Sequence, residues 1–104
     1  MTQINAIVIN ITLDGQNYSE WAFCVETALR GHCLYFYLTD HPPTVVADPS
    51  NANAVQTWEI NNGKVMAAMV NSVKQSMIMS LRKFRTAEAI WSHLKERYVQ
   101  DSGA

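Results

Sequence analysis

The sequence predicts an all-α fold, a bundle of about four to five helices preceded by an extended N-terminal arm. Three observations lead to this prediction. Apolar residues recur at helical spacing in separate segments, three of these segments carry one tryptophan each, and only the first dozen residues alternate as an extended chain does. With 104 residues, 48% hydrophobic and 16% charged, the chain has the size and composition of a single globular domain.

Residues 1–12 form the predicted arm. Ile7, Ile9 and Ile11 alternate with other residues at a period of two, which is the spacing of one face of an extended chain. An extended segment must pack or pair its backbone and its apolar face with something. The arm can therefore lie over its own domain or pair with a second copy, and these three isoleucines are candidate self-association residues.

Residues 13–99 form the predicted helical domain. A turn at residues 14–15 precedes a first helix, for which Asn17 is a suitable N-cap and Glu20 a capping-box partner. Gly31 stands where this helix is expected to stop. The inward stripe of the first helix comprises Tyr18, Trp21, Val25, Ala28 and Leu29.

Four further segments lie between the first helix and the last one. Residues 34–38 are predicted to form one or two turns in the core, and a proline-containing connector follows from about 39 to 53. A long helix is expected from about 54 to 73, with a weak point at Gly63, and a short one follows near 77–81. The long helix directs Val55, Trp58, Val65, Met66, Met69 and Val73 to one side.

Thr86 is the predicted N-cap of the last helix. Glu88 near its start and Lys95 and Arg97 near its expected end suit the helix dipole. Its inward stripe comprises Ala87, Ile90, Trp91, Leu94 and Tyr98. Residues 100–104 are expected to be a frayed tail, and the three tryptophans are expected to share one core.

Charge is distributed unevenly along the chain. Residues 1–63 hold six acids against one base, a net −5, whereas residues 74–97 hold six bases against two acids, a net +4. The candidate nucleic-acid patch is Lys74, Arg82, Lys83, Arg85, Lys95 and Arg97. The isoelectric point of about 6.2 is far below that of a typical nucleic-acid domain, so a solvated face is the other interpretation. The asymmetry itself also suits head-to-tail contact between copies.

No motif in the sequence supports catalysis. Asp101-Ser102-Gly103 matches the tripeptide of retroelement aspartic proteases, but no strand precedes it and no second carboxylate is paired with it. A zinc site would need all of Cys24, His32, Cys33 and His41, whose spacing is not that of a zinc motif. We therefore expect no enzyme, no metal and no cofactor. No signal peptide or membrane-length apolar run is present, so a cytoplasmic location is expected.

One combination of residues resembles a known family. It consists of Leu13-Asp14-Gly15, Asn17-Tyr18, Trp21, Trp58 at the start of a long helix, and Thr86-Ala87, Ile90-Trp91, Leu94 and Tyr98. Their order and spacing resemble the N-terminal, capsid-like part of the Gag polyprotein of Copia-type LTR retrotransposons, especially those of plants. The resemblance implies a structural core signature of Leu13, Tyr18, Trp21, Trp58, Trp91, Leu94 and Tyr98, with no catalytic or ligand role.

The resemblance implies a helical module that self-associates into homo-oligomers or virus-like particles that package RNA. Family polyproteins continue into further capsid helices and a zinc knuckle, so the chain is expected to be an excised domain or a truncated, host-adopted copy. A host-adopted copy would act as an adaptor or as an inhibitor of assembly. Binding of RNA through the basic segment stays open as an alternative.

Overall fold

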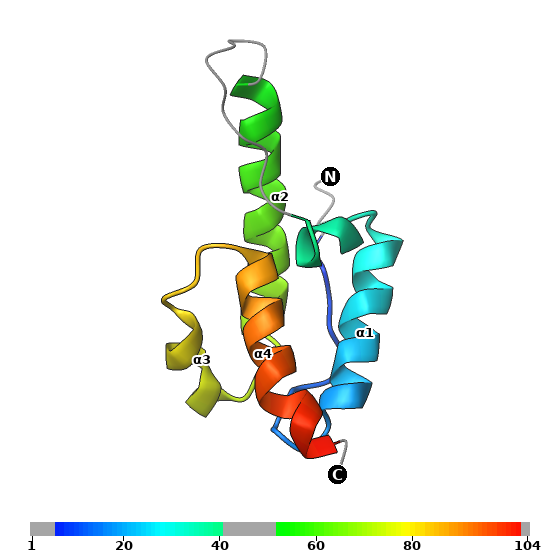
Figure 1. The fold of residues 1–104 in the computed structure, drawn as a ribbon. Helices are drawn as coiled ribbons and strands as arrows, with labels where there is room; N and C mark the ends of the chain where they lie inside the picture. Colours follow the sequence, from blue (N-terminus) through cyan, green and yellow to red (C-terminus); the bar gives the residue numbers. More distant parts are fainter. Residues whose placement is uncertain (1–5, 41–51, 103–104) are drawn as a thin grey trace.

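The computed structural model describes residues 6–40 and 52–102 and confirms the all-α fold (Figure 1). The helices are α1 (Tyr18–Gly31), α2 (Ala52–Val70), α3 (Gln75–Leu81) and α4 (Ala87–Ser102), and one 3-10 turn, η1, spans Tyr35–Leu38. Within the described residues the nearest approach to a strand is an isolated parallel bridge between Leu13 and Val73. The predicted connector falls mostly on residues 41–51, which lie outside the described part.

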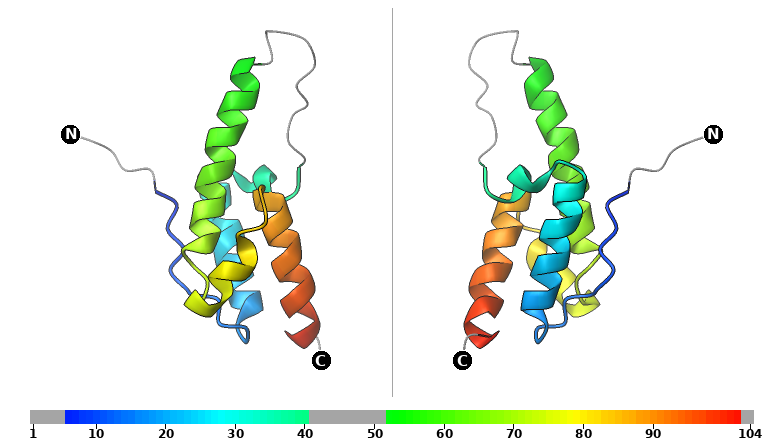
Figure 2. Two further views of the ribbon diagram at one scale, coloured as in Figure 1. Left: turned by 90° about the vertical axis from the view of Figure 1, so that its left-hand side faces the viewer. Right: turned by 90° about the vertical axis from the view of Figure 1, so that its right-hand side faces the viewer.

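Helices α1 and α4 lie side by side and run antiparallel (Figure 1). Helix α4 packs against α1, α2 and η1. The arm runs along α1 and α2 on the side away from α4, as both views in Figure 2 show. The N-terminal end of α2 projects beyond the rest of the bundle (Figure 1).

The arm packs on its own domain. Ile7, Ile9 and Ile11 are half-buried against the core, and Val8 between them is exposed, so the predicted alternation is present. Leu13 is fully buried and fixes the end of the arm, because its N–H donates to the Ser72 carbonyl and its carbonyl accepts the Lys74 N–H, both at 2.8 Å. The arm therefore lies over its own domain, which is one of the two packing modes that the sequence left open.

Helix α1 begins where the sequence predicts but is capped differently. Asn17 precedes the helix, yet its side chain makes no capping bond. Its Oδ1 instead accepts the N–H of Asp14 at 3.0 Å, and its Nδ2 donates to the Thr12 carbonyl at 2.9 Å. The predicted capping box with Glu20 is therefore wrong, because the Asn17 amide is used to tie the arm to the helix start.

The end of α1 also differs from the prediction. Gly31 is the last helical residue, but the left-handed residue of the helix end is Cys33, at φ 60°. The Leu34 N–H donates to the Leu29 carbonyl at 2.8 Å and the Cys33 N–H donates to the Arg30 carbonyl at 3.1 Å, which is the Schellman pattern. A residue with a Cβ thus occupies a position that favours glycine.

The core is built around two of the three tryptophans. Trp21 and Trp91 lie 5.9 Å apart between ring centroids, and Tyr18 lies within 6.5 Å of both. Leu13 and Leu94 are buried with them, and Tyr98 packs against this cluster.

Trp58 does not belong to that cluster, so the prediction of a core shared by all three tryptophans is wrong for it. It is half-buried on α2 and contacts the Tyr37 ring at 5.9 Å. The reason is geometric: Trp58 lies nearly two helical turns before Val65, which is the first fully buried apolar residue of α2.

Helix α2 is continuous through Gly63, and its junction with α4 depends on Asn62. The Asn62 Oδ1 accepts the Ala87 N–H at 2.8 Å, and its Nδ2 donates to the Arg85 carbonyl at 3.1 Å. Thr86 is the N-cap that the sequence predicts, since its Oγ1 accepts the Ala89 N–H at 3.1 Å.

Helix α4 continues to Ser102, beyond the expected end at residue 99. Residues 100–102, which the sequence predicted as part of a frayed tail, have a helical backbone. Lys95 and Arg97 consequently lie in the middle of α4, and its last turn carries no base.

Candidate functional site

The six predicted nucleic-acid residues are all exposed, but they do not share one face. Arg82, Lys83 and Arg85 lie on the turn between α3 and α4. Lys95 instead faces the groove between α1 and α4. The remaining two are Lys74, which directly precedes α3, and Arg97, whose Nε donates to the Tyr98 hydroxyl at 3.2 Å. The tertiary structure thus separates Lys95 from the basic turn.

The residues considered for metal binding and protease chemistry are not assembled into such sites in the described chain. Across residues 6–40 and 52–102, no three His, Cys, Asp or Glu side chains gather closely enough to hold a metal ion. Cys24 is half-buried and Cys33 exposed, both as free thiols, and His41 lies outside the described residues. Asp101 and Ser102 are part of α4, so their backbone is helical.

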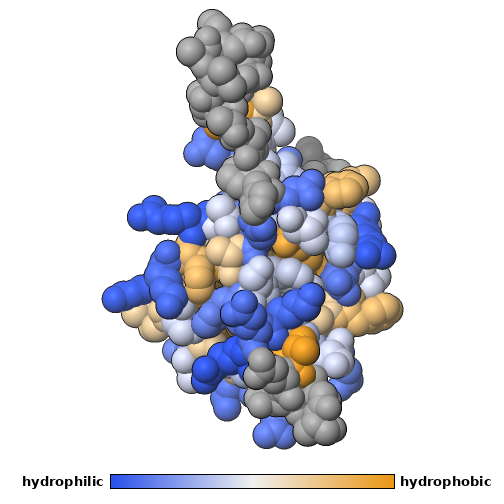
Figure 3. All heavy atoms as spheres, in the orientation of Figure 1, coloured by the Kyte–Doolittle hydropathy of each residue, from blue (hydrophilic) through white to orange (hydrophobic). Residues whose placement is uncertain are grey.

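A groove lies between α1 and α4. Its volume is about 370 Å³, and Tyr35 of η1 contributes to its lining. Two apolar side chains stand at its rim, Phe23 on α1 with 68% of its surface exposed and Val99 on α4 with 39%. Figure 3 shows hydrophobic side chains standing out from a largely hydrophilic face on the α1 side and over the C-terminal half of α4.

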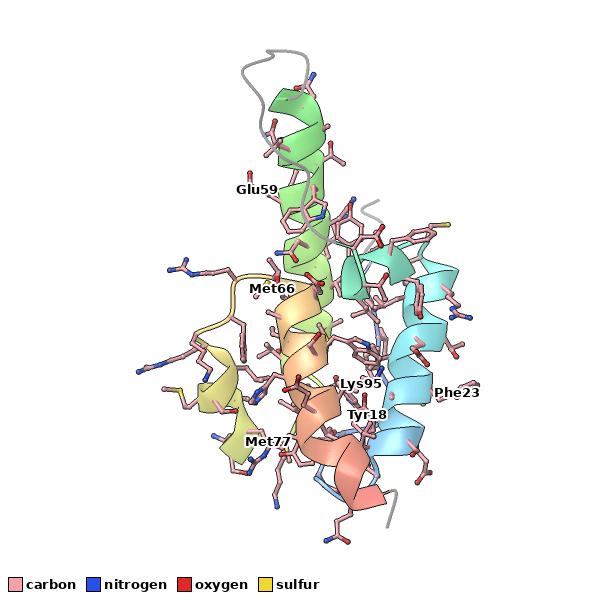
Figure 4. The ribbon with its side chains drawn as sticks, in the orientation of Figure 1. Tyr18, Phe23, Glu59, Met66, Met77 and Lys95 are labelled. Carbon is pink, nitrogen blue, oxygen red and sulfur yellow. The ribbon has the colours of Figure 1, made fainter. Side chains whose placement is uncertain are left out.

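Opposite charges line the two walls of this groove. Glu26 lies on the α1 wall and Lys95 on the α4 wall. Figure 4 shows Tyr18 and Lys95 close together between the two helices, whereas Phe23 points away from the bundle. Burial, together with the negative charge of Glu26, raises the pKa of Tyr18 from 10.0 to about 12, because both disfavour the phenolate. The shift extends to higher pH the range over which Tyr18 stays neutral in the folded protein.

A second hollow of about 380 Å³ lies between the end of α1, η1 and α2. Its lining residues are Cys33, Phe36, Tyr37, Asp40 and Trp58. Three of these five are aromatic, and one is a carboxylate. The hollow is therefore both apolar and acidic.

Comparisons with protein-family models, curated proteins and solved structures find no match. None of the helices in the described part of the chain is long and apolar enough to cross a membrane.

Sequence reasoning did not single out Phe23, Phe36 or Asp40 as surface features. A signal for Phe23 exists, because it is a large apolar residue two positions after Trp21 and so lies on the opposite side of a helix from the inward stripe. For Phe36 and Asp40 no comparable periodic signal is available, since a four-residue 3-10 turn is too short to define a face.

Proposed function

We propose that this chain is a non-enzymatic, cytoplasmic self-association domain whose copies meet through the groove between α1 and α4. One observation carries the proposal: exposed apolar side chains, Phe23 and Val99, flank a groove whose opposite walls carry Glu26 and Lys95. Removing exposed aromatic surface from water stabilises association, and aromatic side chains that become buried are common anchors of interfaces.

The charges make the groove self-complementary. Because each copy carries both Glu26 and Lys95, a twofold contact can place Glu26 of each copy opposite Lys95 of the other. Such a contact fixes the register, while the apolar rim supplies most of the affinity. A capsid-like role, as the resemblance to Copia-type Gag implies, requires contacts of this kind between copies.

The proposal is tested by the mass of the protein in solution over a wide concentration range. The wild-type chain is expected to exceed its monomer mass of 11.7 kDa as concentration rises. Phe23→Ser is expected to weaken association at least about tenfold, as loss of an interface anchor does. Met79→Ser is the matched control, because Met79 on α3 is 63% exposed and does not line the groove.

A charge exchange tests the geometry of the contact. Glu26→Lys and Lys95→Glu are each expected to weaken association by placing like charges opposite each other, and the double exchange is expected to restore it. A chain that stays monomeric at all concentrations would refute self-association. Equal losses in Phe23→Ser and Met79→Ser would refute the groove as the interface.

Binding of RNA is a second candidate function, favoured by one observation. Arg82, Lys83 and Arg85 are all exposed within a single turn, where three positive charges can meet a phosphate backbone. Fluorescence anisotropy with a single-stranded RNA at increasing salt tests it, since counterion release makes such binding fall steeply with salt. Absence of binding at low salt would remove this function.

A host-adopted adaptor or assembly inhibitor would use the same groove for a different protein. Capture of copies of the chain itself or of Gag-like proteins from a host extract would count against that function and for self-association.

A further inference from the structure

We propose that the hollow lined by Cys33, Phe36, Tyr37, Asp40 and Trp58, the aromatic hollow, binds an organic cation of the alkylammonium class. Among the described residues, its lining has no member in common with the lining of the α1–α4 groove. The proposal is independent of self-association. The aromatic hollow has a volume of about 380 Å³, which is at the lower end of the range of small-ligand sites.

The first argument is the aromatic surface that the core does not use. Leu38 is the residue of η1 that becomes fully buried, whereas 64% of the Phe36 surface stays exposed. Trp58 lies outside the main core cluster and faces the hollow instead. Exposed aromatic area is costly in water, and its concentration around one hollow indicates a surface suited to a ligand.

The second argument is charge. Asp40 is the acidic member of the lining, and no lysine, arginine or histidine is among the described residues that line the hollow. The faces of aromatic rings carry a negative quadrupole that attracts cations. Both features favour a positively charged ligand over a neutral or anionic one.

The third argument is that these groups are held in place. The Asp40 N–H donates to the Phe36 carbonyl at 2.8 Å, and its Oδ1 accepts the Thr39 hydroxyl at 3.2 Å. The Tyr37 hydroxyl accepts the Asn61 Nδ2 at 3.2 Å. Because ordered groups lose little freedom on binding, such an arrangement favours affinity.

The ring geometry indicates where the cation would lie. Tyr37 and Trp58 are in contact with each other, with centroids 5.9 Å apart and ring planes tilted by 34°, so no cation fits between them. The ligand would lie beside this pair, on the side where Phe36 and Asp40 complete the lining.

The protein already makes a related contact next to the hollow. The Arg30 guanidinium lies 4.2 Å from the centroid of the Tyr35 ring, which in turn meets Phe36 edge-on at 6.4 Å. Tyr35 and Arg30 are not part of the lining of the hollow. A cation–π contact is thus already present on a ring that neighbours Phe36.

Choline and its neutral isostere 3,3-dimethyl-1-butanol are suitable probes, because they share shape and differ in charge. The indole N–H signals of ¹⁵N-labelled protein report binding at each tryptophan. Choline is expected to shift the Trp58 signal saturably while the neutral isostere leaves it nearly unchanged. The Trp21 signal serves as an internal reference, since its Nε1–H is buried and donates to the Ser72 hydroxyl at 3.1 Å.

Variants then separate the contributions of ring and carboxylate. Phe36→Ala is expected to weaken choline binding about two- to fivefold, the loss of one exposed cation–π contact. Asp40→Asn is expected to weaken it and to reduce its salt dependence. Phe23→Ala, at an aromatic residue with similar exposure outside the hollow, is expected to leave it unchanged.

Three results would overturn the proposal. Equal shifts with choline and the isostere would make the hollow an apolar surface without charge preference. No shift of Trp58 with choline, in protein whose Trp21 signal shows a folded core, would remove the site. Unchanged choline affinity in both Phe36→Ala and Asp40→Asn would place the cation elsewhere.

Discussion

Replacing Asn62 by alanine tests how α2 positions α4. Asn62 is 94% buried by its neighbours, with 6% of its surface exposed, and it satisfies two backbone groups at the start of α4. The first is the N–H of Ala87, a fully buried residue, and the second is the partly buried carbonyl of Arg85. Asn62→Ala removes the partner of both groups at once.

The size of the effect follows from these burial states. A buried polar group without a partner costs about 1–3 kcal/mol, so we assign about 2 kcal/mol to the Ala87 N–H and about 1 kcal/mol to the less buried carbonyl. Alanine is the better helix former by up to about 0.7 kcal/mol, which offsets part of this loss. The expected net loss in the free energy of unfolding is therefore about 2–3 kcal/mol.

Urea denaturation measures this loss, and hydrogen exchange shows where it arises. The midpoint should fall with an unchanged slope, and the Ala87 amide should exchange faster than amides in the middle of α1. Asn61→Ala is the matched control, because it makes the same chemical change one residue earlier. Asn61 donates to the Tyr37 hydroxyl at 3.2 Å and is less buried, so it should cost under about 1 kcal/mol.

A loss in Asn62→Ala no greater than in Asn61→Ala would refute this reasoning. In that case the Asn62 amide would not be needed to hold the start of α4, and Thr86 alone would cap the helix.

Three further predictions concern backbone conformation and pH. Cys33→Gly should stabilise the protein by about 1 kcal/mol in urea denaturation, because its φ is 60°, whereas the same change at helical Cys24 should destabilise it by about as much. Gly63→Ala should stabilise α2 by about 1 kcal/mol, since nothing lies within 4 Å of the added Cβ, while Gly15→Ala, at φ 98°, should destabilise; equal signs at the two positions would contradict this. Because the pKa of Tyr18 is raised to about 12, its neutral form is favoured in the folded protein; stability is present below pH 10 and should fall by about 2–3 kcal/mol as pH rises from 10 to 12. Tyr18→Phe should remove that part of the fall, and identical pH profiles for the two proteins would exclude it.

The sequence alone predicted the elements with strong local signals. The buried stripes of α1 and α4 follow from spacing, because the apolar residues of an amphipathic helix recur on the side that faces the core. The role of Thr86 as N-cap follows from the chemistry of its hydroxyl. The half-buried alternation of the arm was likewise readable from the sequence. Of the residues that line the groove and the hollow, the sequence analysis singled out Tyr18, Cys33, Lys95, Trp58 and Trp91, each for another role.

What the sequence could not provide was the partner of each side chain. Asn17 was interpreted as a cap, but its amide bonds to Thr12 and Asp14 before the helix. The amide of Asn62 bonds to Arg85 and Ala87, which are 23 and 25 positions away and are brought near by folding. Trp58 fits the same helical stripe as Val65, yet it packs against Tyr37 and lines the aromatic hollow.

The groove and the hollow are properties of the tertiary structure. Phe23 and Val99 are 76 positions apart in sequence, and they line the same groove because α1 and α4 pack against each other. Local periodicity determined which residues face inward, since it depends on neighbours three and four positions away. Which outward residues share a surface depends on helix packing, and no local pattern encodes it.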